Sequence, residues 1–244
     1  MAVDFEKNSQ LYAAPDLTEG VDYARRHRRH ERFDDSLARA GELPKTVVLA
    51  PHGGGIEPGT SELCLAVAGY HPANLPMVPP AGVTHDYWMF EGVRPDDNAP
   101  LHVPSTGCDD SVAEALCAGA LNAVSLHGFK PESAGFPAGT RRVLVGGLDE
   151  DLRDLLLETL DQVRLPVEPA GSHGELNGDS PLNIVNRTKR GMGAQLELSE
   201  PLRETMFATF TRPARKHTTT EVFWTFVAAC RDAIDRLEAE QVVL

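Results

Sequence analysis

The sequence predicts an α/β protein in which a mixed sheet lies between two layers of helices. Three observations lead to this prediction. The chain has 244 residues, a length at which such folds bury one large core. Short β-branched and apolar runs alternate with longer segments of helical periodicity. No internal repeat or low-complexity tract interrupts this order, so we expect a single α/β catalytic domain over residues 45–244.

Five short apolar runs are expected to form strands. They are rich in Val, Leu and Ala, and polar or turn-forming residues flank them. Because helical segments alternate with these runs, we expect helices to cover both faces of the sheet. The runs span residues 46–50, 123–126, 142–145, 165–167 and 195–198.

Helical periodicity is clearest late in the chain. Residues 149–163 place leucines at intervals of three and four, and Thr219 or Thr220 could cap a final helix with a similar apolar stripe. Shorter helices are expected over 62–68 and 111–121. These patterns are typical of core-facing helices, and we assign them no function.

The segment from 70 to 110 interrupts this regular pattern. Prolines recur in it, and the fixed φ and missing N–H of proline oppose both helix and strand. We therefore expect the segment to be largely loop. Long loops in compact domains often build binding sites, so this one is predicted to form a wall of the cleft.

The first 44 residues are predicted to form a helical N-terminal extension. Five arginines and two histidines concentrate between residues 25 and 32. A solvated helix face explains such a cluster. Contact with a polyanion is the alternative, although no aromatic residues are interleaved for stacking. The formal net charge of −13 argues against general nucleic-acid binding.

The most informative motif is HGGGIE, from His52 to Glu57, which follows the first predicted strand after Pro51. Imidazole nitrogen and carboxylate oxygen are ligand types that zinc uses. The glycines between them can adopt positive φ and turn the chain tightly, so that both side chains could face one ion. A hydrogen-bonded structural histidine is the alternative. A phosphate-binding loop is disfavoured because the lysine and hydroxyl that end a P-loop are missing.

A second histidine occupies the same position on another predicted strand. Residues 123–126 are followed by His127 and Gly128. In open α/β sheets, ligands collect beyond the carboxyl ends of the strands, so neighbouring strands would bring His52, Glu57 and His127 to one edge. The sequence therefore predicts one zinc ion with these three ligands and a fourth position open for water.

Glu197 is the predicted catalytic residue. Gln195, Glu197 and Ser199 alternate with two leucines, so on a strand their side chains share one face. A carboxylate beside a metal-activated water can take a proton from it and pass one to the leaving amine. An ordinary half-exposed strand with an unremarkable glutamate is the alternative.

Four segments, taken together and in this order, resemble those of the poly-γ-glutamate hydrolase family of Bacillus and its phages, whose fold is related to zinc carboxypeptidases. The resemblance implies a zinc-carboxypeptidase-like three-layer fold, with His52, Glu57 and His127 matching the zinc ligands. It also implies that Glu197 corresponds to the carboxypeptidase glutamate that activates water. The segments are HGGGIEPGTSEL from His52, LHVPST from Leu101, SLHG from Ser125 and NIVNRTKRGMGAQLELS from Asn183.

Four further residues are predicted to contact the substrate. Zinc carboxypeptidases hold the substrate carboxylate with an Asn-Arg pair, and Asn186-Arg187 resembles it, although this pair follows the second zinc histidine. Arg187 could instead hold a carboxylate within a polymer or stabilise the oxyanion, and a solvated basic turn is a further alternative. His102 could donate to the oxyanion or cap a loop, and Thr106 lies in the same segment.

These features predict a zinc-dependent hydrolase that cleaves γ-glutamyl amide bonds in poly-γ-glutamate or shorter γ-glutamyl compounds. A zinc amidase or deacylase acting on N-acyl amino acids or cell-wall peptides is one alternative, and a non-catalytic carboxylate-binding protein is another. The net charge of −13 fits poorly with a long polyanionic substrate. Salt screens exposed charges beyond roughly 8 Å, however, so a local cationic pocket could still bind carboxylates.

The expected setting is cytoplasmic. The first residues lack the basic start and apolar run of a secretory signal, and no stretch is long and apolar enough to span a bilayer. Release by lysis would suit a phage-related protein. No nucleic-acid or membrane partner is expected, and the sequence leaves the oligomeric state open.

Overall fold

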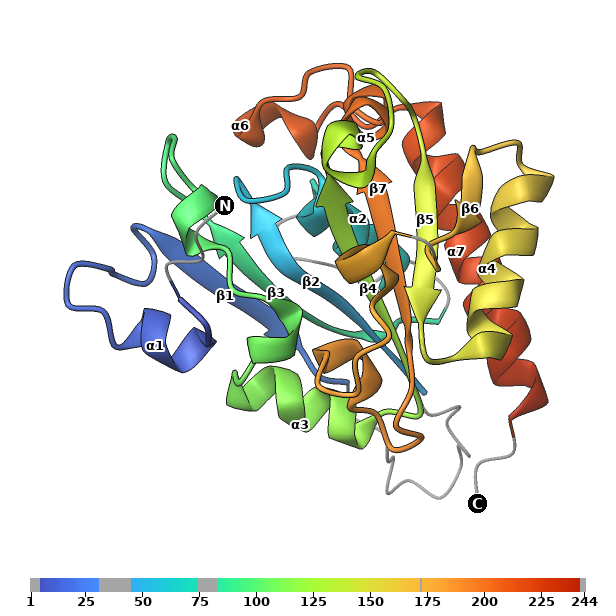
Figure 1. The fold of residues 1–244 in the computed structure, drawn as a ribbon, viewed down its shortest axis with the longest axis horizontal. Coiled ribbons are helices and arrows are strands. Elements are labelled where there is room, and N and C mark those ends of the chain that lie inside the picture. Colours follow the sequence, from blue (N-terminus) through green and yellow to red (C-terminus); the bar gives the residue numbers. More distant parts are fainter. Residues whose placement is uncertain (1–4, 31–44, 74–82, 172, 242–244) are drawn as a thin grey trace.

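A seven-stranded mixed sheet forms the centre of the computed structural model (Figure 1). The structure describes residues 5–30, 45–73, 83–171 and 173–241. The strands are β1 Tyr23–Arg28, β2 Thr46–Gly54, β3 Asp86–Gly92, β4 Asn122–Phe129, β5 Val143–Gly147, β6 Val167–Pro169 and β7 Ala194–Ser199. They lie in the order β1-β3-β2-β4-β7-β5-β6. Strand β1 is antiparallel to β3 and β5 is antiparallel to β7, whereas the other neighbours are parallel.

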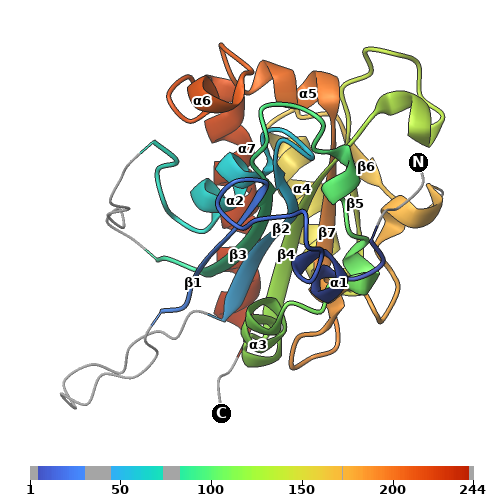
Figure 2. The same ribbon diagram turned by 90° about the vertical axis from the view of Figure 1, so that its left-hand side faces the viewer.

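Helices cover both faces of this sheet (Figures 1 and 2). In the described part of the chain they are α1 Asn8–Tyr12, α2 Thr60–Val67, α3 Ser111–Gly119, α4 Glu150–Gln162, α5 Glu200–Thr205, α6 Arg212–Arg215 and α7 Glu221–Glu240. Helices α2, α4 and α7 pack on one face, and α1 and α3 pack on the other. The predicted three-layer α/β architecture is therefore confirmed. No described helix is both long and apolar enough to cross a membrane.

The sheet separates two hydrophobic cores, and single strands contribute to both. On β2, Val48 packs with α2 and α7, whereas Val47 and Leu49 pack toward α1 and α3. Successive side chains on a strand point to opposite faces, so a strand buried on both sides is apolar at nearly every position. This explains why the sequence shows continuous apolar runs in place of strict alternation.

Four of the five predicted strands are present as β2, β4, β5 and β7, and the predicted helices correspond to α2, α3, α4 and α7. The strand predicted over 165–167 is shifted by two residues and appears as β6. Strand β3 was not predicted, because it lies in the proline-rich segment from 70 to 110. Over residues 86–92 the segment forms a strand, so the prediction that it is loop was wrong there. The run contains no proline, and its aromatic residues Trp88 and Phe90 are buried between the neighbouring strands and helices.

The described N-terminal residues belong to the fold and do not form a separate helical extension. Helix α1 has five residues, and β1 pairs with β3 at the edge of the sheet. Leu11 of α1 is fully buried in the core shared with α3. The predicted helix face is a strand, because Arg25, Arg26 and Arg28 all lie on β1. Arg32 of the same basic cluster lies outside the described residues.

Candidate metal centre and catalytic site

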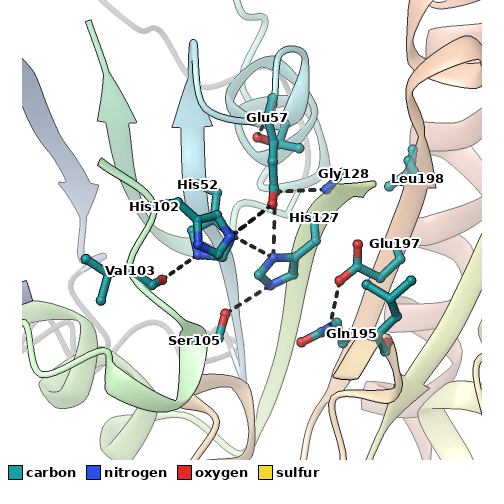
Figure 3. Close-up of polar contacts among 12 residues, drawn as sticks. His52, Glu57, His102, Val103, Ser105, His127, Gly128, Gln195, Glu197 and Leu198 are labelled. Atoms are coloured by element: carbon teal, nitrogen blue, oxygen red, sulfur yellow. Dashed lines mark hydrogen bonds and ion pairs between the residues drawn. The ribbon is translucent and has the colours of Figure 1, made fainter. Parts of the chain in front are cut away.

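Three neighbouring strands, β2, β4 and β7, carry the candidate site residues at their carboxyl ends (Figure 3). His127 on β4 and Glu197 on β7 are register partners, so their side chains leave the sheet on the same face. Their neighbours along each strand, Leu126 and Leu196, point the other way into the core with α2, α4 and α7. The same alternation that buries the leucines thus aligns the two polar side chains.

His52 reaches this face because strand β2 contains a β-bulge. Ala50 points into the core beneath α2, and strict alternation would send His52 there as well. The pairing of β2 with β3 shifts register between Ala50 and Gly53, where Pro51 has no N–H to contribute to the ladder. The extra residue turns His52 to the opposite face, beside His127.

The glycine-rich turn brings Glu57 back to His52, as the motif predicts. The N–H of Glu57 donates to the carbonyl oxygen of His52 at 2.8 Å. Gly54 has a φ of 69°, a left-handed conformation that favours glycine. From the next strand, the N–H of Gly128 donates to Oε2 of Glu57 at 2.8 Å. The carboxylate is therefore held by its own turn and by the end of β4.

The donor atoms of the three predicted ligands converge (Figure 3). Nδ1 of His52 lies 3.0 Å from Oε1 of Glu57 and 3.1 Å from Nδ1 of His127. Nδ1 of His127 lies 3.7 Å from Oε2 of Glu57. Both histidines are buried and the glutamate is partly buried. Side chains from two strands and one turn thus present nitrogen and oxygen atoms to a common point.

Contacts on the far side of each ring indicate which nitrogen faces this point. Nε2 of His52 lies 2.7 Å from the carbonyl oxygen of Val103, so this nitrogen carries a proton and donates it. In the neutral ring the lone pair is then on Nδ1, toward His127 and Glu57. Nε2 of His127 lies 3.5 Å from the hydroxyl of Ser105. Metal-ligating histidines commonly donate their other ring N–H in this way.

Burial and mutual charge perturb the pKa values of the cluster. Burial lowers the pKa of His127 to about 3, so its ring is neutral near neutral pH. Burial alone would raise the pKa of Glu57, but His52, followed by His102 and His127, lowers it well below its usual range. Burial also opposes the charged form of His52, yet the Glu57 carboxylate raises its pKa. A metal cation bound among these groups would take the place of the proton that charges the His52 ring.

His102, which the sequence predicts as a substrate contact, lies in the same cluster. Its ring stacks on that of His52, with centroids 3.8 Å apart and 28° between the ring planes. Donor atoms of His52, Glu57 and His102 all lie within 4.8 Å of one another. The His102 side chain is 40% exposed, against 3% for His127. The structure therefore offers two candidates for a third protein ligand.

Glu197 lies beside the cluster on the polar face of β7 (Figure 3). Nε2 of Gln195 donates to its Oε1 at 3.0 Å, and Nδ2 of Asn183 donates to Oε1 of Gln195 at 2.9 Å. Burial, and then the charge of Glu57, raise the pKa of Glu197 well above its usual range. Two carboxyl groups whose pKa values are pushed apart are typical of acid–base sites. Sequence reasoning missed Asn183, because a loop residue that supports a strand has no periodic signal.

Asn186 and Arg187 have their hydrogen-bonding groups occupied by the protein. The Asn186 amide donates to two backbone carbonyl groups and accepts from two backbone N–H groups, those of Gly178, Ser180, Leu148 and Gly193. The Arg187 guanidinium donates to the Glu114 carboxylate and to the carbonyl groups of Cys108, Leu182 and Thr106. These contacts give both side chains a structural role. Their binding of substrate, like that of Thr106, stays a prediction.

Comparison with known proteins identifies the family. The family model described as poly-gamma-glutamate hydrolase matches residues 25–229. The chain belongs to this family. The match confirms the resemblance drawn from the four sequence segments and extends it into strand β1, which agrees with the place of β1 in the sheet.

Relatives occur in Bacillus subtilis strain 168. The SPbeta prophage-derived protein YoqZ is 32% identical over 184 residues, which cover 75% of this chain and 60% of YoqZ. The protein YmaC is 30% identical over 192 residues, which cover 79% of this chain and 73% of YmaC. The chain thus spans less than two thirds of the length of YoqZ.

Two solved structures share the fold. A bacteriophage poly-gamma-glutamate hydrolase aligns with a TM-score of 0.79 and 27% identity, covering 98% of this chain and 100% of that one. A zinc-free apo structure of YndL aligns with a TM-score of 0.78 and 25% identity, covering 96% and 98% of the two chains. The three-layer architecture is therefore common to these proteins over nearly their whole length.

Proposed function

We propose that this chain is a zinc-dependent hydrolase of γ-glutamyl amide bonds, with His52, Glu57 and His127 as metal ligands and Glu197 as the proton-transfer residue. The observation that carries the proposal is the convergence of two imidazole nitrogens and one carboxylate at the ends of β2 and β4. Family membership supports the hydrolase activity, and the zinc-free designation of the YndL structure supports the choice of metal.

The spacing of the donor atoms fits a zinc ion. Ligand atoms about 2.0–2.1 Å from a tetrahedral zinc lie about 3.3 Å from one another. The corresponding separations among His52, Glu57 and His127 are 3.0, 3.1 and 3.7 Å. The two histidine rings meet at 64° with centroids 4.9 Å apart, so lone pairs in their planes can point to one ion.

Ring geometry favours His127 over His102 as the third ligand. An imidazole binds a metal in its ring plane, along the lone pair of the nitrogen. The planes of His52 and His102 are inclined by 28° at a centroid separation of 3.8 Å. Lone pairs in two stacked planes run nearly side by side, whereas those of His52 and His127, whose planes meet at 64°, can converge on one ion. We therefore assign His102 to the substrate side, where its ring could donate to a developing oxyanion.

The remaining residues fit general acid–base catalysis. When bound, zinc would supply a Lewis acid that polarises the amide carbonyl and lowers the pKa of water to roughly 7. Glu197 would take the proton of the attacking water and pass one to the departing nitrogen. Gln195 holds Oε1 of Glu197 by a hydrogen bond, and no described residue donates to Oε2. That oxygen is therefore available for proton transfer.

The test combines metal analysis with a matched pair of variants. Protein purified without chelator is expected to contain about one equivalent of zinc and to cleave γ-linked but not α-linked polyglutamate. Glu197→Gln is expected to lower turnover by about 1000-fold or more with zinc still bound, because it removes the base and keeps the shape. Glu200→Gln, on the same segment, is the control and should retain activity within a few-fold.

Two results would redirect the proposal. Unchanged turnover in Glu197→Gln would remove the catalytic assignment and favour a carboxylate-binding protein. Cleavage of N-acyl amino acids or cell-wall peptides, with neither polyglutamate cleaved, would keep the metal centre and replace the γ-glutamyl substrate. The polymers and the small substrates should therefore be assayed with the same zinc-containing protein.

A further inference from the structure

A buried arginine lies behind the candidate site. Arg203 belongs to α5 and has 3% of its surface exposed. Its guanidinium lies at the ends of β4 and β7, on the face of the sheet that carries the core with α2, α4 and α7. His127 and Glu197 leave the sheet on the opposite face. The sheet therefore separates Arg203 from a substrate at the site, and any effect on the site passes through the backbone.

Two hydrogen bonds of Arg203 join the segments that carry the two carboxylates of the site. Its Nε donates to the carbonyl oxygen of Leu198 at 3.1 Å, and its Nη1 donates to that of Pro58 at 2.5 Å. Leu198 directly follows Glu197, and Pro58 directly follows Glu57. Because a guanidinium is planar and rigid, its donors fix both the distance and the direction of the groups they hold. Arg203 is therefore a bridge between the end of β7 and the glycine-rich turn.

The end of β4 is the third segment in contact with this guanidinium. A Cβ at Gly128 would lie 2.5 Å from Cζ of Arg203 and 2.7 Å from its Nε, so only glycine lets the guanidinium lie this close to the strand. Gly128 directly follows His127, and its N–H donates to Oε2 of Glu57 at 2.8 Å (Figure 3). One side chain thus contacts the residue that follows each of two proposed metal ligands and the proposed base.

Ion pairing does not explain why this arginine is buried. Arg215, which is 2% exposed, has the Glu62 carboxylate 3.2 Å from its Nε. No described carboxylate lies within 4.0 Å of the Arg203 guanidinium. Burial lowers the pKa of Arg203, and more distant carboxylates, Glu57 foremost, offset this shift only in part. A buried charge without an ion pair is costly, so the carbonyl contacts that keep Arg203 in place call for a function.

We propose that Arg203 is a positioning residue, which sets Glu57 and Glu197 relative to one another by holding the ends of β4 and β7 against the glycine-rich turn. The inference rests on the proposed hydrolase function, in which one carboxylate binds the metal and the other transfers the proton. These roles require a fixed separation, since a displacement of about 1 Å at a reacting group can cost about 100-fold in rate. Without the guanidinium each carboxylate keeps its local hydrogen bonds, but the two segments lose the bridge between them.

Steady-state kinetics of the full chain at saturating zinc test this role. Arg203→Met is expected to lower kcat about 10- to 100-fold and to change KM by no more than about 3-fold, because the side chain does not touch the substrate. Added to Glu197→Gln, it should lower kcat by less than about 3-fold further, since the base that it positions is already gone. The matched control is Arg215→Lys, a buried arginine whose carbonyl acceptors do not adjoin Glu57 or Glu197, and kcat should stay within a few-fold.

Amide hydrogen exchange in the metal-free protein separates this inference from the hydrolase proposal. The N–H of Glu57 donates to the carbonyl oxygen of His52 within the turn. In Arg203→Met this N–H should exchange at least about 10-fold faster than in the parent, while amides at the centre of β2 and β4 keep their rates. The measurement needs neither zinc nor turnover. If the chain hydrolyses none of the substrates, the exchange rate alone decides the positioning role.

Any of three results in folded Arg203→Met would overturn the assignment: an unchanged kcat, an equal loss of kcat with and without Glu197→Gln, or an unchanged exchange rate of the Glu57 N–H. If that variant does not fold, Arg203→Lys decides by the same measurements. A lysine lacks the planar fork that directs two donors to two carbonyl groups, so kcat should fall at least about 5-fold. An unchanged kcat and exchange rate in Arg203→Lys would again overturn the assignment.

Discussion

Two groups of buried and partly buried histidines lie at opposite ends of the same sheet, and their donor atoms are arranged differently. The carboxyl-end cluster consists of His52, Glu57, His102 and His127. The amino-end cluster, at the start of β3, consists of His30, Tyr70, His85 and Asp86. In the first, Nδ1 atoms of two rings lie 3.1 Å apart. In the second, no three described donors meet at a point that could hold a metal.

Each ring nitrogen of His30 in the amino-end cluster has a partner of its own. Nδ1 lies 2.9 Å from the Asp86 carboxylate, and Nε2 contacts the hydroxyl of Tyr70. His85 is fully buried, and neither of its ring nitrogens is hydrogen-bonded to a described residue, although Nδ1 lies 3.8 Å from the Glu238 carboxylate. Burial and histidine content are therefore shared by the two clusters. What distinguishes a metal centre is that lone pairs of several side chains point to one place.

The largest expected effect compares one histidine from each cluster. His127→Ala should lower zinc affinity by more than about 100-fold, beyond the 10- to 100-fold typical of residues that only support a ligand. His30→Ala should leave the zinc content at about one equivalent. Metal analysis after dialysis against a weak chelator measures both. Equal zinc loss in the two variants would mean that the effect comes from unfolding and not from the removed ligand.

The bulge in β2 offers a second way to break the carboxyl-end cluster. Deleting Gly53 should restore regular pairing with β3 and turn His52 toward the core beneath α2, because His52 then stands two residues after Ala50 in an unbroken ladder. Zinc affinity should then fall about as far as in His52→Ala. Pro51→Ala keeps the extra residue and should retain zinc. Zinc binding by the deletion variant would show that the bulge does not orient His52.

The bulge also shows how far the sequence could predict the structure. The strands and most helices were predictable because their periodicity is local, and the motif after each strand placed His52 and His127 at the same edge. A proline within a strand is a recognised sign of a bulge, so Pro51, at the end of the predicted run 46–50, carried usable information that the prediction did not draw on. Strand β3 was missed because the prolines around it dominated the pattern.

Contacts between distant segments could not be predicted. Gln195 is supported by Asn183, and Gly128 admits Arg203, yet neither pair has a sequence spacing that indicates contact. Arg187 shows the converse. Its basic surroundings suggested a substrate contact, whereas the structure commits its guanidinium to Glu114 and to backbone carbonyl groups. Local patterns indicate which side chains share a face, but only the packed fold determines which of them have free hydrogen-bonding groups.

A smaller effect should separate the two candidate third ligands. His102→Ala is expected to retain zinc within about 10-fold of the parent affinity, because the stacked ring cannot share an in-plane ion with His52. Turnover should fall about 100-fold if the ring donates to the oxyanion, with a smaller change in KM. Zinc titration and steady-state kinetics give the two values. A zinc loss as large as in His127→Ala would transfer the third ligand to His102.

The smallest effect concerns the amino-end cluster and acts on stability. Burial, followed by the charges of Arg231 and His30, lowers the pKa of His85 to about 4. Between pH 6.5 and 4 the unfolded chain therefore binds a proton that the folded chain does not, and the free energy of unfolding falls as the pH drops through this window. The full shift corresponds to about 3 kcal/mol. Urea unfolding at several pH values should show a shallower decline in His85→Gln than in the parent, and parallel curves would mean that His85 is not what destabilises the protein in acid.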